Sequence, residues 1–388
     1  MVNINNIFLE LIRVSIGTQD ALSRPLSEKE WAKMYEMAKK QSLVGICFAG
    51  IQRLGADADD GFAKIGLSEI QYFTWMGMSY KIQMRNEAVN KQCAELDKRL
   101  AADGYKSCVL KGQAVAAQYG ALSNLRQPGD IDTWMVAKPK EVIEWARKTG
   151  KMYYYDYHHA DLDIFEGTEV ELHYRPSLSR NLIRNSRLQN WFKTEGAKHI
   201  VSDVNLNPNL NSYSDSKTLP FSMPDYVFNV LLTMNHNFFH LLYEGVGMRQ
   251  FMDMFFILKN CTDDSLHAEA WKLLKYMRLE RFTRAAMWMM KEVFGMDESY
   301  LLCDPDEGSG RFLLEEIMKA GNFGKFDERL KNNRYEGSRI RLMMAWMKHN
   351  LRLIKYYPAD VLWTPIGILR ISLWRRWHYR NETELKNF

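Results

Sequence analysis

The sequence predicts an α+β protein in which a small mixed β-sheet carries helices on one face and is flanked by helical regions on both sides. Apolar residues recur at helical spacing up to about residue 103 and again beyond about residue 225. Between these stretches, short apolar strands first alternate with helices and then follow one another directly. We expect an N-terminal helical region (1–103), an α/β core (104–180), a helix and linker (181–224) and a C-terminal helical domain (225–388).

Two helices of the N-terminal region have clear sequence signals. Ser27 is followed three residues later by Glu30, which is the pattern of a capping box at the start of a helix. Residues 68–102 carry Tyr80 and Met84 among many charged residues, so we expect a long helix on the surface.

The pattern changes at Gly104, where the α/β core begins. Gly120 and Gly150 each follow a short helical stretch, as glycine commonly does at a helix end, and Glu166-Gly167 forms a turn between two strands. The expected strands are 106–110, 129–136, 153–158, 160–165 and 169–174, and the expected helices are 113–119 and 139–148.

The rest of the chain is mainly helical. A stretch rich in Asn, Ser, Asp and Pro (202–224) is the expected linker. The expected helices are 182–192, 226–243, 248–260, 266–294, 310–320 and 339–356.

Composition places the chain among ordinary soluble proteins of 388 residues, with 46% hydrophobic and 26% charged residues. The five cysteines show no CxxC spacing, which argues against a disulfide framework or a structural zinc site. No apolar run has the length of a membrane span and no signal segment is visible, so we expect a cytoplasmic protein. The net charge of +5 is mild and no long basic stripe flanks the core, so nucleic acid is not an expected partner.

The segment 361–380 contains no acidic residue and combines arginines with tryptophans. Two interpretations remain open. The segment forms a helix that contacts a membrane surface or a partner, or it packs its aromatic rings onto the protein and leaves its arginines in water. The arginines are Arg370, Arg375, Arg376 and Arg380, and the tryptophans are Trp363, Trp374 and Trp377.

Asp130 and Asp132 interrupt an otherwise apolar strand. Alternate residues of a strand point to the same face, so the two carboxylates are expected a few ångströms apart, where they repel unless a cation lies between them. Mg²⁺ is the usual cation when the substrate carries phosphates. Glu171, on a later strand that can lie alongside, adds a third carboxylate, and such a set is typical of a two-metal phosphoryl-transfer site.

The Lys111-Gly112 pair precedes the first helix of the core. Free backbone amides and the helix dipole favour phosphate there, Gly112 leaves the approach open, and Lys111 adds a positive charge. The alternative is an ordinary turn with a surface lysine. Arg126 lies four residues before Asp130 and is placed to clamp phosphate or to brace that carboxylate.

The motifs LKG (110–112), RQPGDID (126–132) and VELHY (170–174) resemble the uncharacterised nucleotidyltransferase family, a branch of the DNA polymerase beta-like nucleotidyltransferase superfamily. The similarity is dense from 105 to 175 and loose over most of the remaining chain. The flanking features that agree are Trp31, Ala38, His236, His240 and RQFMD (249–253).

The resemblance implies a nucleotidyltransferase core that transfers a nucleoside monophosphate from an NTP to a hydroxyl of a small-molecule or carbohydrate-like acceptor. Asp130 and Asp132 would bind two Mg²⁺ (or Mn²⁺) ions, and Glu171 would complete the catalytic metal site and help to deprotonate the acceptor. The alternative is a catalytically inactive module of the same fold that binds a partner or a membrane. The residues that would bind the nucleotide are Lys111, Gly112, Gln113, Arg126 and Gly129, and those that would contact substrate are His173, Arg175 and Arg249.

The chain departs from the superfamily pattern at two of these positions. Lys111-Gly112 stands where most members use a Gly-Ser turn to hold the terminal phosphates. The third carboxylate is Glu171, where Asp is common, and its longer side chain can reach the same metal.

The histidines of the core allow more than one interpretation. His173 follows Glu171 by two positions on the same strand face, so it contacts either the metal or substrate, or simply a neighbour in the sheet. His158 and His159 are adjacent on an expected strand, which would turn them to opposite faces and let at most one enter the site.

The helical domain offers two further pairs of polar residues. His236 and His240 share one helix face without a metalloprotease glutamate, so we expect core or interface histidines. Arg249 and Asp253 are four residues apart on a helix and are expected to form an ion pair within it, although Arg249 could also line an acceptor cleft.

Overall fold

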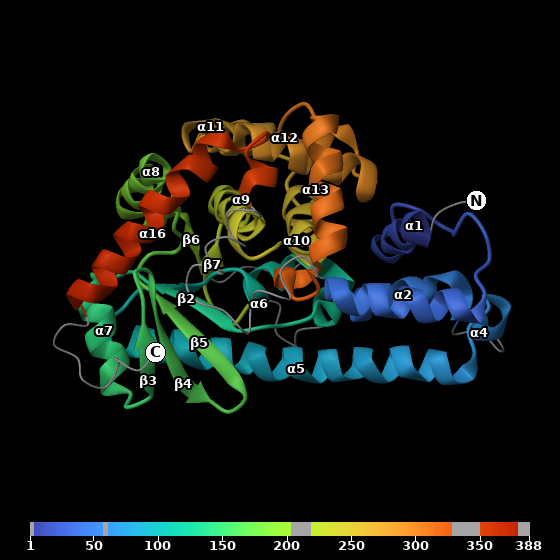
Figure 1. Cartoon of the computed structure of the whole chain (residues 1–388). Coiled ribbons are helices and arrows are strands. Elements are labelled where there is room, and N and C mark those ends of the chain that lie inside the picture. The colour runs from blue at the N-terminus through green and yellow to red at the C-terminus, as the bar shows by residue number, and fades with distance from the viewer. Residues whose placement is uncertain (1–3, 57–60, 203–218, 328–349, 379–388) are drawn as a thin grey trace, which may run out of the picture.

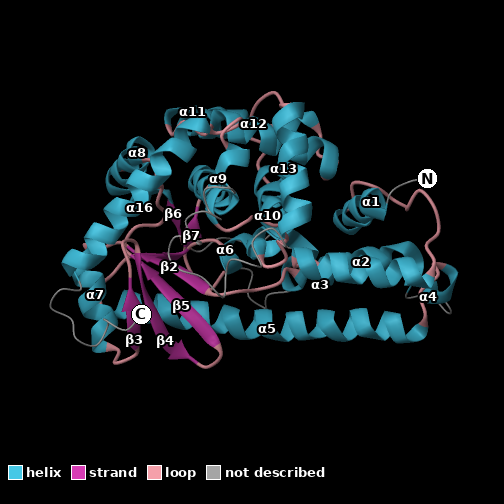
Figure 2. Cartoon of the chain, viewed as in Figure 1, coloured by secondary structure: helices cyan, strands magenta, loops and turns pink. Residues whose placement is uncertain are grey.

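The computed structural model describes residues 4–56, 61–202, 219–327 and 350–378. It confirms the α+β class, because helices surround a five-stranded mixed sheet (Figures 1 and 2). A second sheet of two short strands, β6 (Ile200–Val201) and β7 (Met223–Pro224), lies next to β1 of the main sheet.

The main sheet has the strand order β1-β2-β5-β4-β3. Strands β2 and β5 are parallel, and the other neighbouring strands are antiparallel. The predicted turn between the last two strands is confirmed, with Gly167 at φ +69°. The strands are β1 (Ser107–Val109), β2 (Ile131–Met135), β3 (Met152–Tyr155), β4 (His159–Phe165) and β5 (Thr168–His173).

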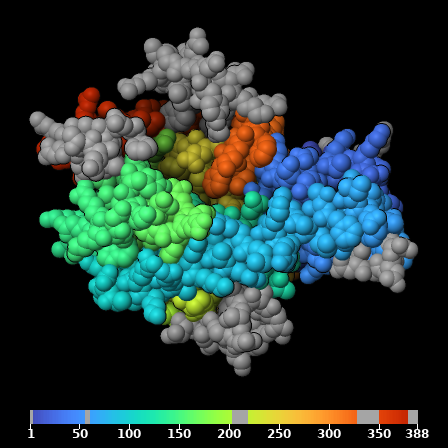
Figure 3. Space-filling model, turned by 90° about the horizontal axis from the view of Figure 1, so that it is seen from below, coloured from blue at the N-terminus to red at the C-terminus, as the bar shows by residue number. Residues whose placement is uncertain are grey.

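Helices α5 (Glu69–Ala102) and α7 (Pro139–Lys148) cover one face of the sheet. Val89 of α5 and Val142 of α7 belong to one hydrophobic cluster with strand residues such as Leu172. Burying these side chains stabilises the layer by about 2 kcal/mol each. Figure 3 shows α5 crossing the molecule from the sheet to the N-terminal helices. The opposite face of the sheet stays available for polar side chains.

The N-terminal and C-terminal helices share a second, larger hydrophobic cluster. Hydrogen bonds also join them: Arg13 Nε donates to the Val293 carbonyl (3.0 Å) and Gln41 Nε2 to the Ile317 carbonyl (3.0 Å). These helices are α1 (Ile4–Ile16), α2 (Glu28–Gln41), α3 (Val44–Ile51), α4 (Gly61–Lys64), α8 (Leu182–Thr194), α9 (Tyr226–Tyr243), α10 (Met248–Lys259), α11 (Asp264–Tyr276), α12 (Glu280–Trp288) and α13 (Glu307–Ala320).

The helix signals of the N-terminal region are confirmed. Ser27 is the N-cap of α2, and its backbone N–H donates to the Glu30 carboxylate at 3.0 Å. The long surface helix is α5, whose N-cap is Ser68.

Two predicted helices differ from the observed ones. The single helix expected at 266–294 is divided into α11 and α12, because Arg278 adopts a left-handed conformation at φ +57°. No Gly or Pro marks this break in the sequence. The helix expected at 113–119 is a short helix α6 (Gly112–Ala116), followed by a 3₁₀ segment (Ala117–Leu125) that turns at Gly120.

Most of the predicted linker (202–224) and of the predicted helix at 339–356 lies outside the described residues.

The last described helix, α16 (Pro358–His378), runs along the outside of the molecule, past α8 and toward α7 (Figure 1). Trp374 packs edge-on against Tyr155 and Tyr157, so the expected inward packing of the basic aromatic segment is observed for this ring. Across the described residues, no helix is both long enough and apolar enough to cross a membrane.

Gly45 lets α3 lie directly against the segment that leads into the site. A Cβ at this position would come within 2.4 Å of the Leu125 carbonyl oxygen, which is backbone and cannot rotate away. We expect Gly45→Ala to destabilise the protein by about 1–3 kcal/mol. Gly77→Ala on exposed α5, where a Cβ meets no described atom within 4 Å, is expected to stabilise it by about 0.5–1 kcal/mol. Thermal unfolding followed by circular dichroism measures both, and equal effects would contradict the prediction.

Candidate active site

The polar face of the sheet forms one wall of a cavity of about 590 Å³. Helices α9, α10 and α16 form much of the remaining wall. The predicted residues that line this cavity are Lys111, Gly112, Arg126, Gly129, Asp130, Asp132, Glu171, His173 and Arg249. The structure therefore brings together side chains from four parts of the chain that the sequence could only treat separately.

The carboxylates come together through the pairing of two parallel strands. Asp132 on β2 lies directly beside Glu171 on β5 in the strand register. The strand begins at Ile131, one residue later than a strand carrying both aspartates would require, so Asp130 belongs to the preceding loop. Asp130 nevertheless lines the same cavity. The prediction of one strand bearing both aspartates is thus corrected, while their convergence on one site is observed.

Charge is concentrated at these carboxylates. Burial, together with the negative charges of Asp132 and Glu171, raises the pKa of Asp130 to about 6. Burial alone would also raise the pKa of Asp132, but the Lys111 ammonium and a hydrogen bond from His173 lower it. A cluster of buried carboxylates favours the binding of a cation in addition to these two side chains.

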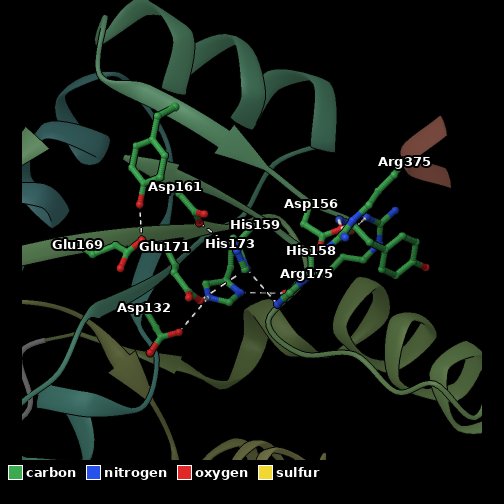
Figure 4. A network of polar contacts seen from close by, with 12 residues as sticks. Asp132, Asp156, His158, His159, Asp161, Glu169, Glu171, His173, Arg175 and Arg375 are labelled. Carbon is green, nitrogen blue, oxygen red and sulfur yellow. Dashed lines mark hydrogen bonds and ion pairs between the residues drawn. The ribbon is translucent and has the colours of Figure 1, made fainter. Parts of the chain in front are cut away.

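His173 connects two of the carboxylates (Figure 4). Its Nε2 lies 3.0 Å from Asp132 Oδ1 and 3.2 Å from Glu171 Oε2, and its Nδ1 lies 3.3 Å from the Arg175 carbonyl oxygen. Burial would lower the pKa of His173, but these hydrogen bonds and charges raise it to about 9. The side chain is therefore an imidazolium that donates from both nitrogens at neutral pH. His173 thus contacts its neighbours in the sheet, as one of its two interpretations expected, and those neighbours are the site carboxylates.

Lys111 supplies a second positive charge. Its Nζ lies 2.7 Å from Asp132 Oδ1, which excludes the alternative of an ordinary surface lysine. Its backbone has φ +35°, an unfavourable conformation for a residue with a Cβ, and Gly112 follows at φ +42°. The chain thus adopts a strained turn where Lys111 meets the carboxylates.

The two adjacent histidines do not point to opposite faces. Strand β4 begins at His159, and His158 lies in the bend before it, so both rings line the cavity, with 2.9 Å between His158 Nε2 and His159 Nδ1. The other contacts of His159 are with two carboxylates: its Nε2 lies 2.9 Å from Asp161 Oδ1, and its Nδ1 lies 3.5 Å from Glu171 Oε2. The prediction that at most one of them enters the site is wrong, because strand alternation does not apply across a bend.

Asp161 is a site residue that the sequence analysis missed. It lies opposite Glu171 in the register of β4 and β5. The spacing of His159 and Asp161, two apart on one strand, was the available signal.

Arg126 forms a buried ion pair with Asp253 of α10. Its Nε and Nη2 lie 2.7 Å and 2.8 Å from the two carboxylate oxygens, and Tyr119 donates its hydroxyl to the same carboxylate at 2.6 Å. The predicted ion pair between Arg249 and Asp253 is therefore wrong: Arg249 donates instead to the Gln127 carbonyl at 2.7 Å. This arrangement ties α10 to the loop that carries Gly129 and Asp130.

The remaining predicted residues lie at the margin of the site or beside it. Gln113 is buried and donates to Asn86 Oδ1 (3.2 Å) on α5. Arg175 stacks on the Tyr157 ring at 4.2 Å. The Nε2 atoms of His236 and His240, both on α9, lie 3.0 Å apart, and both rings line the cavity. Burial holds the pKa of His236 far below its usual value, so that ring is neutral.

The donor set fits a divalent cation. Carboxylate oxygens of Asp132 and Glu171 lie within 4.8 Å of one another, and His173 holds both carboxylates by hydrogen bonds. Asp130 lies close enough for the charges of Asp132 and Glu171 to raise its pKa, and a cation would relieve that repulsion. Carboxylate oxygens are the ligands that Mg²⁺ and Mn²⁺ prefer.

The sequence matches the model of a known protein family. The model of a family described as uncharacterised nucleotidyltransferase matches residues 27–295, which is more than half of the chain and contains the whole sheet. Helix α16 lies outside the matched range. No curated protein matches the sequence.

Proposed function

Because this chain belongs to the uncharacterised nucleotidyltransferase family, we propose that it transfers a nucleoside monophosphate from an NTP to a hydroxyl of a small-molecule or carbohydrate-like acceptor. The observation that carries the proposal is the pairing of Asp132 with Glu171 across β2 and β5, with Asp130 and Lys111 in the same cavity. Carboxylates held side by side next to a lysine suit a substrate that brings both phosphates and metal ions.

We assign the metal ligands to Asp130, Asp132 and Glu171. Divalent ions held there would polarise the phosphates and the attacking hydroxyl. His173 already bonds Asp132 and Glu171 through one nitrogen and the backbone through the other, so it fixes the orientation of both carboxylates.

The phosphates of the nucleotide would lie toward the β1 side of the site. Lys111 and Gly112 follow β1 in the chain. The Arg249 guanidinium lies close enough to the Asp130 carboxylate to interact with its charge. At Gly129 an added Cβ would meet no described atom within 4 Å, so the surrounding protein does not require a glycine there. A close approach of ligand to backbone is a reason for this residue.

The acceptor would lie on the opposite side of the carboxylates. Beyond Glu171 the sheet continues through β4 and β3, where Asp161 and then Tyr154 lie in the same register row as Glu171, and His159 pairs with His173. The acceptor oxygen would bond to the α-phosphorus while the bond to the bridging oxygen breaks and pyrophosphate leaves, and Glu171 would take the hydroxyl proton.

Isothermal titration of the protein with Mg²⁺ and each of the four NTPs tests the proposal. We expect the wild type to bind at least one NTP in a metal-dependent manner and the Asp130→Asn/Asp132→Asn variant to lose this binding. The control is the single Asp163→Asn variant, which changes an exposed aspartate of β4 and should bind NTP normally. A wild type that binds no NTP, or a double variant that binds equally well, would refute the enzyme and leave the non-catalytic alternative.

A further inference from the structure

Helix α16 has an inner face that is fixed to the protein. Arg375 forms an ion pair with Asp156 at 2.5 Å, and Trp374 packs against Tyr155 and Tyr157. Gly367 lies so close to residue Arg180 that a Cβ would come within 2.4 Å of its carbonyl oxygen. These contacts fix which side of α16 faces the protein body and which side faces away from it.

The side of α16 that faces away carries a row of large apolar residues, which we call the outer stripe. Their spacing of four, three, four and four residues places them along one side of a helix, over about 22 Å. All five side chains are exposed, whereas apolar side chains of the core are buried. The outer stripe consists of Leu362 (66% exposed), Ile366 (47%), Leu369 (58%), Leu373 (55%) and Trp377 (77%).

Beyond Asp360, the charges that the described part of α16 carries are basic, and two of its arginines, Arg370 and Arg375, contact Tyr157 and Asp156 of the body. No acidic residue occurs from 361 to 380, and Arg376 is exposed beside Trp377. The nearest preceding acid, Asp360, is buried in an ion pair with Arg184. An apolar row with basic residues and a terminal tryptophan is the composition of helices that lie in the interface of an anionic membrane.

We propose that the outer stripe of α16 attaches this protein to the surface of a membrane that contains anionic phospholipids. A second copy of the chain is a poorer occupant, because the same segment of that copy would again present arginine and no carboxylate. Lipid phosphates supply the missing negative charge, and the acyl region accepts the apolar side chains. The helix lies on the membrane, since it does not have the apolar length needed to cross one.

The attachment has a consequence for the cavity. The inner side of α16 contributes Ile368, Ile371 and Ser372 to the cavity wall. A bound membrane would therefore lie about one helix diameter, roughly 10 Å, from the cavity. The attachment itself does not depend on the proposed transferase activity.

Flotation of the full-length protein with vesicles tests the proposal. We expect flotation with phosphatidylcholine vesicles that contain about one third phosphatidylglycerol, little with phosphatidylcholine alone, and a decrease at high salt. The Leu369→Glu/Leu373→Glu variant replaces two exposed side chains and should lower the bound fraction at least about tenfold, without a change in melting temperature.

The matched control is Phe73→Glu/Tyr80→Glu on α5, where both side chains are also exposed (50% and 61%) and the charge change is the same. It should float like the wild type. Equal loss in both variants, retained flotation of the α16 variant, or equal binding to uncharged vesicles would overturn the proposal. So would a wild-type dimer in analytical ultracentrifugation that the α16 variant abolishes, because the outer stripe would then be a subunit interface.

Discussion

Lys111→Met is expected to change metal affinity and nucleotide affinity in opposite directions. The Lys111 ammonium lies 2.7 Å from Asp132 Oδ1, so it occupies a position on the carboxylate that a metal ion needs. Its removal should raise the affinity for Mn²⁺ alone by about 10–100-fold, which corresponds to one charge-assisted hydrogen bond of about 1.5–3 kcal/mol. The affinity for Mn²⁺-NTP should fall, because the phosphates lose a positive partner. Electron paramagnetic resonance of free Mn²⁺, with and without NTP, measures both.

The control for this prediction is Lys140→Met on α7. That lysine side chain is 86% exposed and forms only a long ion pair with Glu144, at 3.7 Å. The charge of the protein changes by the same amount, but neither affinity should change. If Lys111→Met lowers both affinities, Lys111 holds the carboxylates in place and does not compete with the metal.

Asp253→Ala is expected to destabilise the protein more than any surface substitution. It would leave the Arg126 guanidinium buried without its carboxylate and would also remove the acceptor of the Tyr119 hydroxyl. Loss of one partner of a buried ion pair costs about 3–5 kcal/mol. Urea unfolding followed by circular dichroism should show a clearly lower midpoint.

Two further variants separate the causes of that loss. Glu95→Ala breaks an exposed ion pair with Arg99 on α5 and should cost less than about 1 kcal/mol. Arg126→Met/Asp253→Leu removes both buried charges and should recover much of the stability lost in Asp253→Ala. A double variant as unstable as the single one would show that packing around Tyr119, and not an unpaired charge, is responsible.

Much of the fold followed from local sequence patterns. Ser27 with Glu30 placed the start of α2, and periodicity placed α5 and α9, because these signals depend on neighbours three or four residues away. The division between α11 and α12 could not be predicted in this way. It depends on Arg278 in a left-handed conformation, which no glycine announces.

The site was predictable only in part for a related reason. Asp130, Asp132 and Glu171 stand out as carboxylates in apolar surroundings. Asp161 and His158 do not, because the first depends on the pairing of β4 with β5 and the second on a bend before a strand. Likewise, the partner of Asp253 was expected four residues away on its own helix but is Arg126, which is 127 residues distant.

The sequence by itself determined the fold class, the family resemblance and the residue types of the site, since these are properties of short segments. Only the tertiary structure decided which charges meet: Lys111 and His173 on Asp132, Arg126 on Asp253, and the inner face of α16 on the cavity. Electrostatic partners are set by distance in space, and strand register and helix packing fix that distance between segments that the sequence separates.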